Sequence, residues 1–212
     1  MEQFEVRHLL DIKAELGEAP CWSVEQEALY WVDIEAKTLN RFDPATGRNE
    51  SWSVPATPGC FNFREGGGAV LATNQGFFDF DFATNRFEKI CDAPFDPAAW
   101  RFNDGKADRQ GRLWAGSMKL AFRIDGPPEG TFYRYEAGSV VAGLPGVMVP
   151  NGTAFSPDGT TMYRSDWRPE GKVVLQYDYD VANGTPSNER LFADMPEGFG
   201  IPDGAAVDSE GF

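Results

Sequence analysis

The chain has 212 residues, and its 19 Lys and Arg against 33 Asp and Glu give a formal net charge of −14 at pH 7. This acidic balance argues against a nucleic-acid or membrane-surface role, because both depend on clustered basic side chains. No window approaches the roughly 18 consecutive apolar residues of a spanning helix, and the first ten residues lack the pattern of a signal peptide, so we expect a soluble, cytoplasmic protein that is a monomer or a small homo-oligomer.

Residue types that carry thiol or imidazole chemistry are scarce. Cys21, Cys60 and Cys91 are scattered without CxxC spacing, so we expect free thiols rather than a disulfide framework or a thiolate zinc site. His8 is the one histidine of the sequence, which excludes a zinc site built from several histidines. No GxSxG motif marks a serine nucleophile.

Short segments with many β-branched and aromatic residues follow one another along the chain. They predict strands and hairpins rather than helices, because Gly, Pro, Asp and Asn interrupt them before a helical period can develop. The clearest examples are residues 28–47, 69–85, 112–118, 130–138 and 172–184. We therefore predict an all-β protein.

A similar unit recurs along the chain. A polar residue stands before Ala or Gly, a turn follows, and a second strand begins with an aromatic residue. Glu18, Asp104, Asn151 and Asp203 occupy this slot at separations of 86, 47 and 52 residues, and a further unit starts near Asn62. A period of roughly 40–50 residues built from short strands is typical of propeller blades. We predict four repeats and the beginning of a fifth.

The repeats are expected to form one domain over residues 1–212, because no linker or low-complexity tract divides them. We interpret this domain as truncated at its C-terminus, since the fifth unit stops where its second strand would start. A β-sandwich with recurring turns is the alternative. The aromatic residues that recur at related positions are expected to pack between the repeats. They are Trp22, Trp31, Trp114, Phe155 and Tyr163.

The shared slot suggests a metal site. In a propeller the first strand of each blade lines the central channel, so Glu18, Asn151 and Asp203 would converge. Two carboxylates and an amide oxygen repel one another unless a cation lies among them. Oxygen ligands suit a hard divalent ion such as Ca²⁺, Mg²⁺ or Mn²⁺, and Zn²⁺ and Fe²⁺ stay open. Each residue by itself is also an ordinary turn former.

The chain resembles the regucalcin (senescence marker protein), gluconolactonase and sugar-lactonase family. Four ordered motifs from about Leu16 to the last residue carry the resemblance: LGEAPCW followed by YWVDI, then RFNDGKADRQGRLWAGSM, VPNGTAFSPDG and IPDGAAVDSEG. The resemblance implies an all-β, six-bladed β-propeller, of which this chain covers about four blades and the start of a fifth. It also implies a divalent metal at the top of the channel.

The same resemblance implies roles for individual residues. Glu18, Asn151 and Asp203 would be the protein ligands of the metal. Asp203 would also be the catalytic acid or base. Arg101 and Asn103 would face the substrate. By its chemistry Arg101 could contact ring hydroxyls, with a surface residue ion-paired to a nearby Asp as the alternative, and Asn103 could offer an amide N–H to the developing oxyanion.

One departure from the family concerns the substrate. After GSM, several relatives carry an acidic residue that touches the sugar, whereas this chain has Lys119, Leu120 and Ala121. We predict that Lys119 contacts the substrate, with a solvent-exposed lysine as the alternative, and the sugar stays open. Asp104 is either a support for Asn103 or a plain turn residue.

The predicted function is metal-dependent hydrolysis of a sugar-acid (aldono) lactone to the open-chain acid. Water would attack the metal-polarised carbonyl, and Asp203 would take the proton or orient the water. Two alternatives stay open: a phosphotriesterase-type hydrolase on the same scaffold, and a non-catalytic calcium-binding regulatory protein. The polar side chains of Arg101 and Asn103 favour a hydroxylated substrate over an apolar phosphotriester.

Overall fold

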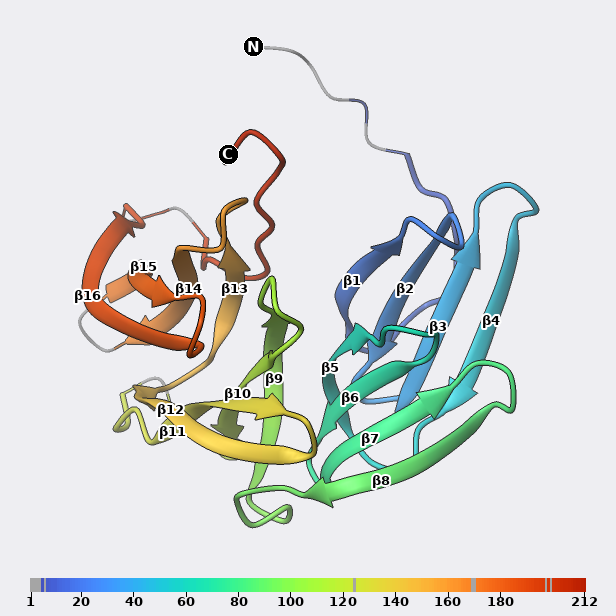
Figure 1. Ribbon diagram of the computed structural model, residues 1–212, viewed down its shortest axis with the longest axis horizontal. Helices are drawn as coiled ribbons and strands as arrows, with labels where there is room; N and C mark the ends of the chain where they lie inside the picture. The colour runs from blue at the N-terminus through green and yellow to red at the C-terminus, as the bar shows by residue number, and fades with distance from the viewer. Residues whose placement is uncertain (1–4, 6, 124, 169–170, 197, 199) are drawn as a thin grey trace.

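A computed structural model describes residues 5, 7–123, 125–168, 171–196, 198 and 200–212. The regular secondary structure of these residues consists of β-strands alone, and the strands form four antiparallel sheets of four strands each (Figure 1). The all-β prediction is confirmed. None of the described segments is an apolar helix of the length that a membrane crossing requires.

The strand order in each sheet follows the chain. The first sheet contains β1 (Gly17–Ser23), β2 (Ala28–Asp33), β3 (Thr38–Asp43) and β4 (Arg48–Ser53). The second contains β5 (Pro58–Phe63), β6 (Ala69–Thr73), β7 (Gly76–Asp81) and β8 (Arg86–Asp92). The third contains β9 (Trp100–Ala107), β10 (Leu113–Lys119), β11 (Gly130–Glu136) and β12 (Ser139–Val147). The fourth contains β13 (Asn151–Phe155), β14 (Thr161–Arg168), β15 (Gly171–Asp180) and β16 (Thr185–Asp194).

The sheets are arranged as propeller blades around a common centre, with the first strand of each sheet innermost (Figure 1). β5 lies against β1 and β9, and β9 lies against β13. The predicted starts of the repeats, near Glu18, Asn62, Asp104 and Asn151, lie in β1, β5, β9 and β13 respectively. Asp203 follows β16 in a stretch without a strand, so the described residues contain no strand of a fifth repeat.

Three hairpins close with the same turn chemistry. The side chains of Asp43, Asp81 and Asp180 each accept the backbone N–H groups two and three residues later. The last residue of each turn donates its N–H to the carbonyl of that aspartate and has a positive φ, which Gly and Asn tolerate best. These residues are Gly47, Asn85 and Gly184.

Apolar side chains fill the spaces between neighbouring sheets. Tyr30, Phe61 and Phe80 belong to the cluster between the first two sheets, and other clusters lie between the second and third and the third and fourth. Burying each large side chain contributes about 1.5–3 kcal/mol. Trp114 and Phe155 are buried in the last of these clusters, as predicted. The same prediction was wrong for Trp22, whose surface is 49% exposed.

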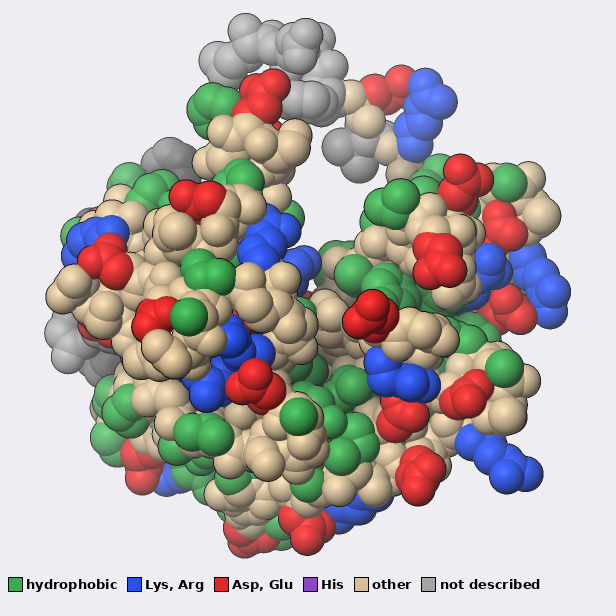
Figure 2. All heavy atoms as spheres, in the orientation of Figure 1, with side chains coloured by type: hydrophobic (Ala, Val, Ile, Leu, Met, Phe, Trp, Pro, Cys, Tyr) green, Lys and Arg blue, Asp and Glu red, His purple; other side chains and the backbone are tan. Residues whose placement is uncertain are grey.

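The cysteines are free, as expected, with Cys60 buried and Cys21 and Cys91 half-buried. Figure 2 shows acidic and basic side chains intermingled over the visible face, without a continuous basic patch.

Candidate functional site

The innermost strands are irregular where the predicted site residues lie. The pairing register shifts directly after Glu18 in β1 and after Asn151 in β13. The next residue, Ala19 or Gly152, has a φ of 51° or 59°. β5 and β9 also contain register shifts. Because a bulge changes the direction of neighbouring side chains, these strands can present residues that the regular alternation of a strand would point elsewhere.

A chain of polar contacts joins Arg101, Asn103 and Asn151. Arg101 Nη1 donates to Asn103 Oδ1 at 2.6 Å and to the Phe102 carbonyl oxygen at 2.9 Å. Asn103 Nδ2 donates to the Pro150 carbonyl oxygen at 2.9 Å and to Asn151 Oδ1 at 3.0 Å. β9 and β13 thus bring together three of the predicted site residues, two from the third repeat and one from the fourth.

Asp203 lies beside Asn151. In the amide orientation just described, Asn151 Oδ1 is 3.1 Å from Asp203 Oδ1, so two acceptor oxygens face each other. With the amide turned over, the Asn151 amide nitrogen donates to Asp203 over the same 3.1 Å. The Ser165 hydroxyl in β14 is 3.1 Å from the Pro202 carbonyl oxygen and 3.2 Å from that of Asp203, and donates to both. This contact holds the backbone that carries Asp203.

Glu18 belongs to the same electrostatic group. Burial raises the pKa of Glu18, the charges of Asp203 and Asp104 raise this pKa further, and Arg101 lowers it. Burial lowers the pKa of Arg101, against the charges of Glu35 and Glu18. The carboxylates therefore repel one another, and Arg101 partly offsets that repulsion.

The donor atoms fit a hard divalent cation. Glu18 and Asp203 supply carboxylate oxygens, and Asn151 supplies an amide oxygen whose 3.1 Å approach to Asp203 Oδ1 a cation would stabilise. Among the residues that the structure describes, no group of three or more His, Cys, Asp or Glu side chains is placed to hold a metal ion. The predicted set differs from such a group because one of its three donors is an asparagine.

Asp104 faces a cavity of about 330 Å³ among the inner strands, which Glu18, Asn62 and Lys106 also line. Burial raises the pKa of Asp104, although hydrogen bonds to its charged form oppose that shift. Its Oδ2 accepts the backbone N–H of Thr153 at 2.9 Å. Asp104 therefore connects β9 to β13, which is a structural role near the site.

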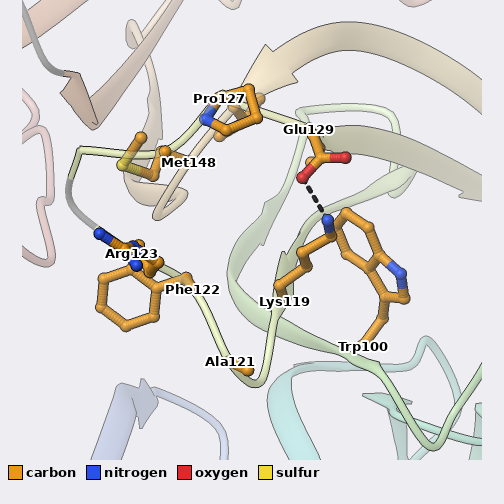
Figure 3. Close-up of a pocket in the computed structure, with 11 residues that line it drawn as sticks. Trp100, Lys119, Ala121, Phe122, Arg123, Pro127, Glu129 and Met148 are labelled. Carbon is orange, nitrogen blue, oxygen red and sulfur yellow. Dashed lines mark hydrogen bonds and ion pairs between the residues drawn. The ribbon is translucent and has the colours of Figure 1, made fainter.

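Lys119 lies in a different pocket, of about 190 Å³ (Figure 3). Its ammonium group forms an ion pair with Glu129 and lies 5.5 Å from the centre of the Trp100 ring. Phe122 and Met148 belong to the other walls of this pocket. The Lys119 ammonium group is engaged by Glu129 rather than by Arg101 or Asn103, and its role in substrate binding stays a prediction.

Three residues near the site were not identified from the sequence. They are Ser165, which holds the Asp203 backbone, and Asp33 and Asp166, which accept backbone N–H groups shortly before Glu18 and Asn151. The signal for the two aspartates was present, because each stands 15 residues after its site residue. Nothing in the sequence distinguishes Ser165 from the other serines.

Comparisons with known proteins agree with this architecture. Residues 16–212 match the model of the SMP-30/Gluconolactonase/LRE-like region. A 6-deoxy-6-sulfogluconolactonase from Pseudomonas putida is 39% identical over 200 residues, which cover 92% of this chain and 66% of that protein. Regucalcin from Danio rerio is 31% identical over 211 residues, which cover 100% of this chain and 70% of that protein.

The structure is similar to that of a calcium-binding protein, regucalcin, from Agrobacterium tumefaciens. The TM-score is 0.87 and the identity 27%, with 96% of this chain and 68% of that one covered. The chain spans about two thirds of the length of these relatives. Because the family model covers nearly all of the chain, the protein belongs to the SMP-30/gluconolactonase/LRE-like family.

Proposed function

We propose that this protein hydrolyses a sugar-acid lactone to the open-chain acid with the help of one divalent metal ion. The observation that carries the proposal is a convergence of polar side chains: hydrogen bonds join Arg101, Asn103 and Asn151, and Asp203 Oδ1 lies 3.1 Å from the Asn151 amide. The charge of Asp203 also acts on Glu18. The family, and the lactone named for the 39% identical relative, support this reaction class.

Glu18, Asn151 and Asp203 would hold the metal. When bound, a divalent ion supplies a Lewis acid that polarises a carbonyl oxygen and lowers the pKa of water. The all-oxygen donor set favours Ca²⁺ or Mn²⁺, with Zn²⁺ and Fe²⁺ as further candidates. The calcium-binding regucalcin of similar structure supports calcium among these.

Arg101 and Asn103 would orient the substrate in different ways. Arg101 carries five N–H donors, and its contacts to Asn103 and Phe102 engage Nη1 alone. The other guanidinium donors can bind ring hydroxyls in a forked arrangement. Both N–H groups of Asn103 are engaged by Pro150 and Asn151, so we propose that Asn103 positions Arg101 and Asn151 rather than donating to the oxyanion.

Asp203 would handle the proton. A water molecule attacks the lactone carbonyl carbon, and the Asp203 carboxylate orients that water and accepts its proton. The bond between the carbonyl carbon and the ring oxygen would then break, and the ring oxygen would take up the proton held by Asp203 and leave as a hydroxyl group. Asp203 is a candidate for this step because its carboxylate lies 3.1 Å from the Asn151 amide, beside the proposed metal ligands.

The four sheets would be blades of a six-bladed propeller. Four of six blades correspond to two thirds of a ring, which agrees with the 66–70% of the relatives' length that this chain covers. A contact of Lys119 with the substrate is part of the same proposal.

The proposal is tested by initial rates of acid release from pentono- and hexonolactones. Protein stripped with chelator receives one ion at a time, and spontaneous hydrolysis is subtracted. We expect a rate that returns with one ion and is lost in Asp203→Asn. A bound ion without any lactone turnover would support a calcium-binding regulator, and turnover of a phosphotriester alone would support that hydrolase instead.

A further inference from the structure

A buried aspartate holds the backbone just before Asn151. Asp166 lies in β14 and is 0% exposed. Its Oδ1 accepts the backbone N–H groups of Met148 at 3.0 Å and Val149 at 3.1 Å. Pro150 separates these two residues from Asn151, so the carboxylate restrains the chain immediately ahead of a proposed metal ligand.

The same arrangement precedes Glu18. Asp33 in β2 is 4% exposed, and its two carboxylate oxygens accept the backbone N–H of Glu15 at 2.8 Å and of Leu16 at 3.1 Å. In both sheets the aspartate follows the proposed ligand by 15 residues and binds the residues two and three positions before it. The first and fourth sheets thus contain the same contact, an aspartate that accepts two backbone N–H groups, at the same distance in sequence from the proposed ligand.

The second sheet contains a related contact without a ligand. Asn74, directly after β6, accepts the backbone N–H of Thr57 at 2.9 Å. Thr57 stands 17 residues before Asn74, which is also the spacing from Leu16 to Asp33. The position 15 residues before Asn74 is Gly59, which has no side chain to position. An aspartate that accepts two backbone N–H groups 15 residues after a proposed metal ligand therefore occurs in the first and fourth sheets, whereas the position 15 residues after Asp104 in the third sheet is Lys119.

Asp166 is itself fixed in place. Arg164 Nη1 donates to Asp166 Oδ2 at 3.2 Å, and Arg164 Nε donates to the Tyr177 hydroxyl at 2.8 Å. Arg164 is 0% exposed. Ser165, between these two residues, holds the carbonyl groups of Pro202 and Asp203. One short piece of β14 therefore restrains the backbone on both sides of the contact between Asn151 and Asp203.

We propose that Asp33 and Asp166 are positioning residues, each of which clamps the backbone before a metal ligand and so fixes the geometry in which Glu18 and Asn151 meet a divalent ion. This inference rests on the proposed function, because it takes Glu18 and Asn151 as ligands. Neither aspartate touches the ion or the substrate. Their loss therefore weakens ion binding by letting the ligands move, as outer-shell changes do at metal sites.

The test compares variants that remove the clamp with one that keeps it. Asp166→Ala removes both acceptor contacts, whereas Asp166→Asn retains Oδ1 for Met148 and Val149 and removes the negative charge. Asn74→Ala is the matched control, because it removes the contact with the Thr57 N–H in the second sheet, which contributes no proposed metal ligand. Asp33→Ala provides a second clamp variant in a different sheet.

Two readouts are measured on the full chain after chelator treatment. Calorimetric titration with Ca²⁺ or Mn²⁺ alone gives the ion affinity, and amide hydrogen exchange without metal reports on the clamped N–H groups. We expect Asp166→Ala and Asp33→Ala to lower the affinity about tenfold and to speed exchange at Val149 and Leu16 respectively. Asp166→Asn should keep slow exchange at Met148 and Val149 and lose less ion affinity than Asp166→Ala, although its amide nitrogen no longer accepts the hydrogen bond from Arg164. Asn74→Ala should speed exchange at Thr57 without changing the affinity.

The outcomes separate this inference from the proposed function. An unaltered protein that binds neither ion overturns the proposed function, and the clamp falls with it. An unaltered protein that binds an ion, with equal affinity in Asp166→Ala and Asp33→Ala, overturns the clamp alone. The clamp is also overturned when Asn74→Ala weakens ion binding as much as they do, since general destabilisation would then explain the loss. If Asp166→Ala does not fold, the ion affinities of Asp33→Ala and Asp166→Asn test the clamp instead.

Discussion

The second and fourth sheets show how one scaffold serves either packing or chemistry. Both contain four antiparallel strands, an irregular innermost strand and a polar side chain that holds the backbone before it. In the second sheet the position 15 residues before the holding side chain is Gly59 rather than a polar residue, and a Cβ atom there would lie 2.4 Å from the Phe102 carbonyl oxygen. In the fourth sheet the slot is Asn151, which contacts Asn103 and approaches Asp203. The strands and the side chain that holds the backbone are thus alike in the two sheets. The residue at the position of Gly59 or Asn151 determines whether this strand contributes to packing or to the candidate site.

The largest effect is expected when the fourth sheet receives the glycine that the second sheet has at the corresponding position. Asn151→Gly removes a proposed metal ligand and the acceptor of the Asn103 amide. We expect ion affinity and kcat/KM to fall by about 100-fold or more, because removing a ligand costs more than the 10–100-fold typical of its outer-shell partners. Calorimetry and lactone hydrolysis measure the two effects.

Asn151→Asp is the matched control, because it keeps an oxygen donor at the same place. It should retain ion binding, with the added negative charge compensated by the ion. Equal ion affinity in Asn151→Gly and the unaltered protein would contradict the assignment of Asn151 as a ligand.

Adding a side chain at Gly59 tests the packing of the second sheet. Gly59→Ala places a methyl group against the backbone of Phe102 and Asn103, where the distances from Cβ would be 2.4–2.7 Å. Because backbone atoms cannot rotate away as a flexible side chain can, we expect a loss of about 1–3 kcal/mol in the free energy of unfolding. Urea denaturation followed by circular dichroism measures it.

Gly200→Ala serves as the control, since nothing lies within 4 Å of its Cβ position. It should leave the urea midpoint nearly unchanged. A Gly59→Ala protein as stable as this control would show that the contact of β5 with β9 is looser than the structure indicates.

The smallest expected effect is a pH dependence in ion binding. Burial and the charges of Asp203 and Asp104 raise the pKa of Glu18 above its ordinary value of 4.5. A protonated carboxyl group is a poor ligand, so ion affinity should fall as the pH decreases, beginning above pH 4.5. Titrations between about pH 5 and pH 7.5 would detect the decrease, and Glu18→Gln should remove it.

Glu25→Gln, at an exposed glutamate in the turn after β1, should keep the pH dependence unchanged. An affinity that is constant down to about pH 5 in the unaltered protein would show that Glu18 does not titrate with ion binding.

The strands and the repeat were predictable because both depend on local patterns. Aromatic and β-branched residues between turn formers identify the strands, and the spacing of Glu18, Asp104 and Asn151 identifies three of the four innermost strands. Trp22 shows the limit of such reasoning. It occupies a strand that the pattern predicts, but its side chain is 49% exposed, because burial depends on what covers a strand.

The site was predictable as a set of residues and less so as a set of roles. Arg101, Asn103 and Asn151 meet in one contact chain, but the amide donors of Asn103 are used by Pro150 and Asn151. Lys119 follows a site motif in the sequence and yet pairs with Glu129 in another pocket. Which donors are engaged depends on partners from other sheets, which no local pattern specifies.

The sequence by itself determined the all-β class, the repeating unit and the polar residues Glu18, Asp104 and Asn151 that recur in it. These follow from strand periodicity and turn chemistry, which act over a few residues. Only the tertiary structure decided that Ser165 and Asp166 of β14 hold the two segments carrying Asp203 and Asn151. The reason is physical: a buried carboxylate must find N–H donors, and a buried hydroxyl must find an acceptor. Which ones they find depends on how the sheets pack.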